Sequence, residues 1–207
     1  AVLFSMMAQQ ADLTFAELAR HYPWLPFIVT PLGLMLVSYL TRRFFPGAES
    51  SGVPQTIAAM EMQNKSAVLS FRNAIGKLLM TTMGLFSGAS VGIQGPSVHI
   101  GASIMFSLHR FAHFPAFYRQ GLIAAGGAAG FAAAFNTPLA GIVFAFEQIS
   151  GNFQQRLNGI VLIAVIFAGM TAIALQGDFH YFGVSQVSFE FDLQLILSIV
   201  ICGVFGG

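Results

Sequence analysis

The chain has 207 residues, of which 56% are hydrophobic and only 8% are charged, whereas a soluble domain has about 25% charged residues. Its net charge of +1 provides no basic surface, which argues against nucleic acid as a partner. The composition instead predicts an integral membrane protein in contact with lipid.

Apolar stretches follow one another along the chain, with short polar breaks between them. Many are shorter than the roughly 20 residues that a spanning helix needs, and Pro or Gly interrupts them. Discontinuous helices of this kind are typical of transporter and channel cores. The pattern predicts an all-α, multi-pass protein of the cell's inner or plasma membrane. We expect helices over residues 24–40, 55–60, 74–86, 97–111, 121–135, 139–149, 159–175 and 193–205, with loops at 47–54 and 177–192.

The first residue is not Met, and the last residues directly follow an apolar run. We therefore expect residues 1–207 to form a single transmembrane domain that is truncated from a longer polypeptide. Under the positive-inside rule we expect Arg42, Arg43, Lys65 and Arg72 on the cytoplasmic side. Lys65 and Arg72 would lie in a solvated inner loop.

The segment from residue 88 to residue 101 places glycine and proline inside an apolar stretch. In a membrane, non-helical backbone is tolerated only where it is buried in protein or lines a wet cavity. Pro96 suits the first turn of a new helix, because the N–H that it lacks would be unpaired there. A helix that begins in mid-membrane points its positive end and its free amides at the cavity. The segment therefore favours an anion site on a transport path.

Three segments together resemble the CLC family of chloride channels and chloride–proton antiporters. Residues 50–54 (SSGVP) are similar to that family's first anion-binding loop, G-S-G-I-P. Residues 92–96 (GIQGP) are similar to its second loop, G-x-E-G-P, and residues 126–141 (GGAAGFAAAFNTPLAG) to its G-A-A-A-G-x-x-A-A-F-N-A-P-L-A-G segment. The resemblance covers nearly the whole chain, up to the helix expected from Leu193.

The resemblance implies a CLC-type multi-helix fold with short, broken and tilted helices. This chain would be the first half of an inverted repeat whose second half is absent from it. The family forms homodimers with a separate pore in each subunit. The helices at 139–149 and 159–175 would then face the partner.

The first loop offers neutral hydrogen-bond donors. Ser51 has a hydroxyl, and Ser50, Gly52 and Val53 have backbone N–H groups ahead of a helix with Pro54 in its first turn. Neutral donors suit a weakly held monovalent anion, since conduction requires the ion to leave again. By resemblance, Ser51 would contact the central chloride and Ser50 the inner site. Alternatively, the segment is an ordinary turn that caps a helix.

The second loop consists of Gly92, Ile93, Gln94 and Gly95. By resemblance these residues would bind the anion, and the third position would be the gate. The family has a Glu there, which occupies the outer anion site and accepts a proton. Gln94 has about the size of a protonated Glu but cannot titrate. Alternatively, Gln94 only hydrogen-bonds the backbone of its own loop.

A second difference from the family concerns the inner proton site. Coupled exchangers have a Glu near the inner end of the helix that follows N-A-P-L-A-G. In our alignment Gln148 occupies this position, and Glu147 matches a preceding family Glu. A shift of one residue would place Glu147 there instead. Lys77, in an apolar helix, either raises the potential along an anion path or extends to the membrane surface.

Two glutamines on one proton path would indicate passive chloride conduction. The alternatives are a chloride–proton exchanger with a different proton path and a non-conducting membrane subunit. Chloride, bromide and nitrate fit neutral donors equally well, whereas Ser51 distinguishes the chain from the family's fluoride branch. We expect no enzyme activity, because no nucleophile elbow or phosphate-binding loop is present. We also expect no cofactor and no metal site, and His99 is expected to be a packed polar residue.

Overall fold

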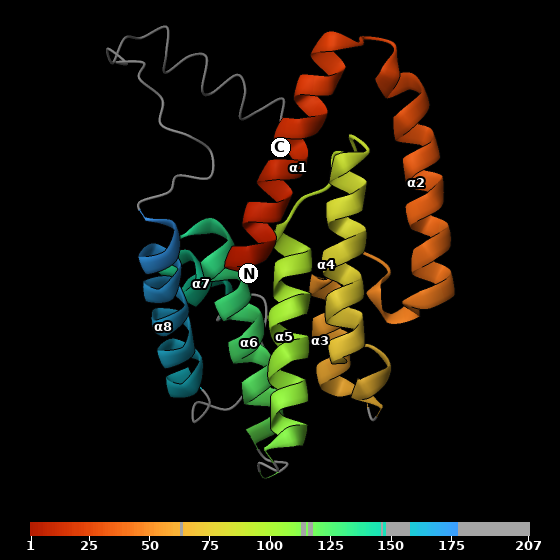
Figure 1. Cartoon of the computed structure of the whole chain (residues 1–207). Helices are drawn as coiled ribbons and strands as arrows, with labels where there is room; N and C mark the ends of the chain where they lie inside the picture. Colours follow the sequence, from red (N-terminus) through yellow and green to blue (C-terminus); the bar gives the residue numbers. More distant parts are fainter. Residues whose placement is uncertain (63, 113–114, 116–117, 146, 148–157, 178–207) are drawn as a thin grey trace, which may run out of the picture.

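The computed structural model describes residues 1–62, 64–112, 115, 118–145, 147 and 158–177, and this part of the chain is helical without strands. The helices are arranged as Figure 1 shows. They are α1 (Val2–His21), α2 (Leu25–Phe44), α3 (Val53–Glu61), α4 (Phe71–Phe86), α5 (Gln94–Phe111), α6 (Arg119–Phe135), α7 (Pro138–Phe144) and α8 (Asn158–Gln176), with 3-10 turns η1 (Pro46–Ala48) and η2 (Lys65–Ala67).

The all-α prediction is confirmed, and α3 and α7 are too short to cross a bilayer. The expected helices from 24–40 to 159–175 each have a counterpart, although their ends differ. The loop expected after residue 177 and the helix expected at 193–205 lie outside the described residues.

Helix α1 has no counterpart among the predicted elements, so the prediction was incomplete at this end. Long apolar runs are the sequence signal for membrane helices, and polar residues interrupt α1 at Gln9, Gln10 and Asp12. The helix forms because its remaining residues are mostly good helix formers. Phe4 and Ala8 are buried in one cluster with residues of α4 and α5, which attaches α1 to the core.

The centre of the molecule is the contact between α5 and α6, where small residues allow the two backbones to approach closely. A Cβ atom on Gly101 would lie 2.1 Å from the carbonyl oxygen of Gly126. A Cβ on Gly130 would lie 2.3 Å from the carbonyl oxygen of Ser97. Close helix contacts of this kind replace the hydrophobic driving force that is absent in lipid. The fold is therefore fixed around α5, whose first residues form the second predicted loop.

Helix α2 lies on the outside of the molecule and has no buried residue. Among the described helices, α2 alone has the length and the apolar composition that a membrane-spanning helix needs. Its apolar side chains are exposed, Phe27 by 83%. Trp24 precedes the helix, and Arg42 and Arg43 lie in its last turn. An apolar helix flanked by an aromatic residue and by arginines is typical of a membrane span.

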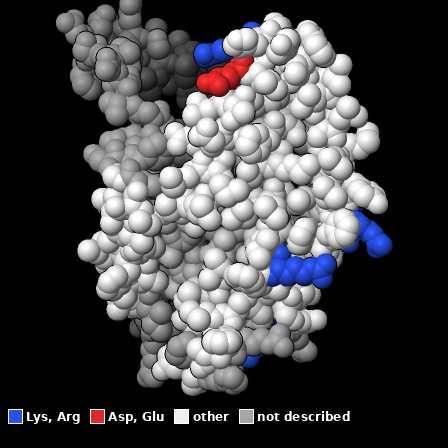
Figure 2. Space-filling view, in the orientation of Figure 1, with Lys and Arg blue, Asp and Glu red and all other residues white. Residues whose placement is uncertain are grey.

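Three arginines lie where α2 ends and α4 begins, and Figure 1 shows these helix ends in the lower part of the molecule. Arg42 and Arg43 end α2, and Arg72, near the start of α4, donates to the carbonyl oxygen of Phe44 at 2.9 Å. We call this end the basic end. Figure 2 shows a face almost free of charged side chains apart from groups near its upper and lower parts. The expectation of a solvated loop is wrong for Lys65, whose side chain is only 9% exposed.

Candidate anion site

The first predicted loop is held in an unusual backbone conformation. Ser50 has a φ of 62° and Gly52 a φ of 119°. Left-handed backbone costs a non-glycine residue about 1–2 kcal/mol, so other contacts must maintain Ser50. Helix α3 begins directly after Gly52, with Pro54 in its first turn as predicted. Its first turn therefore stands beside the loop that carries Ser50 and Ser51.

Lys77 of α4 supplies those contacts. Its ammonium group donates to the carbonyl oxygens of Ala48 at 2.8 Å and Glu49 at 3.1 Å, and also to that of Ser50. The side chain is only 3% exposed, so it does not extend to a membrane surface, and that alternative is wrong. In a trans peptide the carbonyl group and the N–H of the following residue point in opposite directions. Because these carbonyl groups point toward Lys77, the N–H groups of the residues that follow them point away from it.

The two predicted loops touch through their backbones. A Cβ atom on Gly52 would lie 2.4 Å from the carbonyl oxygen of Gly95, and one on Gly95 would lie 2.3 Å from the carbonyl oxygen of Ser51. Both distances are far shorter than any real carbon–oxygen contact, so both positions require glycine. The glycines in these two motifs thus bring residues 50–53 and 92–95 together, although about 40 residues separate them.

The second loop leads directly into α5, which begins at Gln94. Pro96 is the third residue of that helix, in agreement with its predicted place in the first turn. The Gln94 side chain is exposed, and among the described residues it makes no hydrogen bond. The alternative in which Gln94 only bonds its own loop therefore has no support. His99, one turn further along α5, is fully buried, as expected.

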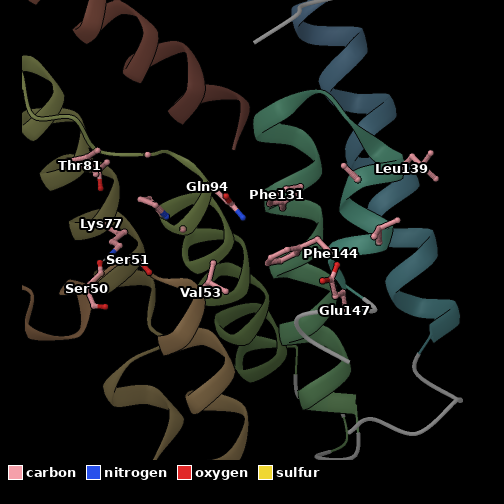
Figure 3. Close-up of a pocket in the computed structure, with 16 residues that line it drawn as sticks. Ser50, Ser51, Val53, Lys77, Thr81, Gln94, Phe131, Leu139, Phe144 and Glu147 are labelled. Carbon is pink, nitrogen blue, oxygen red and sulfur yellow. Dashed lines mark hydrogen bonds between the residues drawn. The ribbon is translucent and has the colours of Figure 1, made fainter. Parts of the chain in front are cut away.

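A cavity of about 890 Å³ lies between these loops and α6–α7. Figure 3 shows Ser50, Ser51 and Lys77 on one side and Phe131, Phe144 and Glu147 on the other, with Gln94 between them. The lining residues are Ser50, Ser51, Val53, Lys77, Thr81, Val91, Gly92, Gln94, Gly95, Pro96, Phe131, Leu139, Ala140, Val143, Phe144 and Glu147.

The cavity contains six of the eight residues predicted to bind the anion. The other two, Gly52 and Ile93, are buried and do not line it. Glu147, one of the two candidates for the inner proton site, lines the cavity with an exposed side chain. Gln148, the other candidate, lies outside the described residues.

Apart from Glu147, the far wall is apolar, and its apolar residues were not part of the predicted site. Phe131 and Phe144 stack with ring centroids 4.6 Å apart and an interplanar angle of 4°. Leu139 and Val143 are 74% and 53% exposed. The signal that could have identified Phe131 lies inside the motif at 126–141, where it is one of two phenylalanines among glycines and alanines. The aromatic pair gives the anion donors a rigid apolar wall to face.

The lining contains one positive and one negative side chain, Lys77 and Glu147, among otherwise neutral residues. Lys77 provides the positive charge, but its three hydrogen bonds go to backbone carbonyls. The atoms that face the cavity from the loops are hydroxyl, amide and backbone groups of neutral residues. Among the described residues no cluster of His, Cys, Asp and Glu could hold a metal ion. The arrangement can accommodate a small anion near a positive potential without a direct ion pair.

Comparison with known proteins agrees with these motifs. A family model described as voltage gated chloride channel matches residues 33–207. Chloride channel protein CLC-d of Arabidopsis thaliana is 30% identical over 225 residues, covering 94% of this chain and 28% of that protein. The H(+)/Cl(-) exchange transporter ClcA of Cronobacter sakazakii is 34% identical over 193 residues, covering 87% of this chain and 40% of that protein. The chain thus spans well under half the length of these relatives.

Proposed function

Because the chain belongs to the voltage-gated chloride channel family, a family of membrane proteins that transport chloride, we propose that it forms one wall of a chloride pathway. We further propose that this pathway conducts passively, without proton exchange. The single observation that carries the proposal is the cavity that joins Ser50 and Ser51 to Gln94. The names of the relatives include both channels and exchangers, so the proposal of passive conduction rests on the residues of this chain.

The donor set supports chloride as the ion. A single hydrogen bond from a neutral donor contributes about 0.5–1.5 kcal/mol net. The Ser51 hydroxyl and the backbone N–H groups at the start of α3 together would bind a halide weakly enough for release. Lys77, held behind the loop, supplies a positive potential without occupying the site. Bromide and nitrate fit the same donors.

Gln94 supports passive conduction. Its amide reaches the cavity, carries no negative charge to compete with chloride, and takes up no proton at any physiological pH. A pathway that lacks a titrating side chain at this position has no means of moving a proton there. Chloride could then pass without a proton moving in the opposite direction.

The test is direct. The full gene product that contains these residues is reconstituted in liposomes under a chloride gradient, and chloride efflux and proton uptake are recorded together. Efflux without proton movement is the expected result. Efflux with proportional proton uptake would refute passive conduction, and the absence of any flux would favour a non-conducting subunit.

A second candidate function rests on Glu147. This carboxyl group lines the same cavity as Gln94, and an ionisable group in a membrane protein's interior is functional by default. An exchanger could use Glu147 as its inner proton site and a route other than Gln94 beyond it. Glu147→Gln would then abolish proton uptake and leave chloride efflux, whereas a passive pathway has no proton uptake to lose.

The exposed apolar surface of α8 suits a buried interface. Phe167 and Met170 are 65% and 61% exposed, and Ile163 is 57% exposed. We propose that α7 and α8 face a second copy of the chain in a homodimer. Light scattering on the full gene product in detergent, with the detergent mass subtracted, would give twice the subunit mass.

A further inference from the structure

Helix α3 is held by a lysine at each end. Lys77 holds the loop before its N-terminus, and Lys65 contacts its C-terminus. The nine residues of α3 are too few to form a stable helix alone, since isolated helices shorter than about 12 residues are marginal in water. Its position must therefore come from contacts with the rest of the fold.

Lys65 lies in η2, directly after α3, and its side chain turns back over the end of that helix. The ammonium group donates to the carbonyl oxygen of Ala59 at 2.8 Å and to that of Met60. Gln120 of α6 donates to the Met60 oxygen at 3.0 Å. The last carbonyl groups of a helix have no partner within the helix. Here two side chains satisfy them, and one of these comes from α6.

Burying the charged ammonium group of Lys65 costs free energy. The connection between α3 and α4 lies outside the spanning helices, at the basic end. Burial lowers the pKa of Lys65, the positive charge of Arg119 lowers it further, and Glu61 partly opposes this. A lysine that served only for solubility would avoid such burial, because its long side chain could reach water.

The electrostatic consequence concerns the opposite end of α3. A helix carries about half a positive charge at its N-terminus and half a negative charge at its C-terminus. The ammonium group of Lys65 lies on the negative end. It therefore offsets the part of the helix field that disfavours an anion, while the positive end beside Ser51 is unaffected. The same contact fixes where that positive end stands.

We propose that Lys65 is a positioning residue for the anion site: it fixes α3 from its far end and so places the donors of residues 50–53 beside Gly95. The proposal deepens the proposed function and rests on it. Lys65 itself does not line the cavity. Its effect reaches the anion only through the helix.

The experiment compares Lys65→Met with Arg43→Met in the full gene product. Arg43 is an exposed residue at the same end, so its loss matches the change in net charge. Chloride affinity is measured by isothermal titration calorimetry, and the protection of the α3 amides by hydrogen exchange. For Lys65→Met we expect chloride affinity to fall about fivefold, which is roughly 1 kcal/mol, together with faster exchange over residues 53–61. Arg43→Met should change neither quantity.

Lys65→Arg tests whether the effect of Lys65→Met comes from the lost charge and contact or from a general loss of stability. It keeps a cation that can reach the same carbonyls, so it should restore most of the affinity. Unchanged affinity or unchanged exchange in Lys65→Met would overturn the proposal, as would an equal effect of Arg43→Met. A wild-type protein that binds no chloride would refute the proposed function instead. Amide hydrogen exchange in α3 would then still decide whether Lys65 holds that helix.

Discussion

The contact between the two loops gives the sharpest test of the site. In Gly95→Ala the new methyl group would lie 2.3 Å from the carbonyl oxygen of Ser51. That atom belongs to the backbone, so it cannot rotate away as the tip of a side chain could. Overpacking of this kind costs about 1–3 kcal/mol. The helix propensity of alanine would return about 0.5–1 kcal/mol, because Gly95 is the second residue of α5.

The net expected destabilisation is therefore roughly 0–2.5 kcal/mol in the free energy of unfolding. The loops must separate to accept the methyl group, so chloride affinity should fall more clearly than stability. Gly92→Ala is the matched control, because Gly92 lies in the same loop and lines the same cavity, yet a Cβ there meets nothing within 4 Å. Thermal unfolding and chloride titration of both variants in detergent would measure the two effects. Equal chloride affinity in Gly92→Ala and Gly95→Ala would refute the reasoning.

Three further predictions concern side chains of the cavity. Gln94→Glu should slow chloride flux near neutral pH and make it acid-activated, because an ionised carboxylate would compete with the anion; flux that is independent of pH in liposomes would contradict the gate assignment. Ser51→Ala should weaken chloride binding by about 0.5–1.5 kcal/mol without abolishing it, since the backbone donors remain; a calorimetric titration with no measurable binding would contradict this. Lys77→Met leaves three carbonyl groups without their donor; Ala48 is buried, and an unpaired buried carbonyl costs about 1–3 kcal/mol, whereas the carbonyls of the exposed Glu49 and Ser50 can bond to water. A melting temperature equal to that of the wild type would show that the lysine does not hold the loop.

Six of the eight residues that the sequence motifs predicted to bind the anion line the cavity of the candidate site. The loop motifs place Gly52 and Gly95 in the candidate site, and the structure adds that each glycine contacts the other loop. Pro54 and Pro96 indicated where two helices begin. These predictions succeeded because glycine and proline act on the local backbone, which the sequence states directly.

The roles of the two lysines could not be predicted in the same way. Lys77 and Lys65 bind carbonyls that lie 27 to 29 and 5 to 6 residues away along the chain. A lysine in an apolar segment is equally compatible with extension to the membrane surface, so its partner depends on tertiary packing. The omission of α1 has a similar cause. Its buried residues are Phe4 and three small residues, Ser5, Ala8 and Ala11, and these do not form a long apolar run in the sequence.

The lysines also explain how a site made of neutral groups can attract an anion. Anion transport needs a positive potential for entry, but a cation in direct contact would hold the ion too tightly for release. In this structure Lys77 lies behind the backbone of the first loop, and its N–H groups are already bonded to carbonyls. Under the proposed function its charge would act on the cavity through the loop, while a hydroxyl and backbone amides would contact the anion. We expect that a second cation in the lining, one not bonded to backbone carbonyls as Lys77 is, would strengthen anion binding and slow transport, because the anion could then pair with it directly.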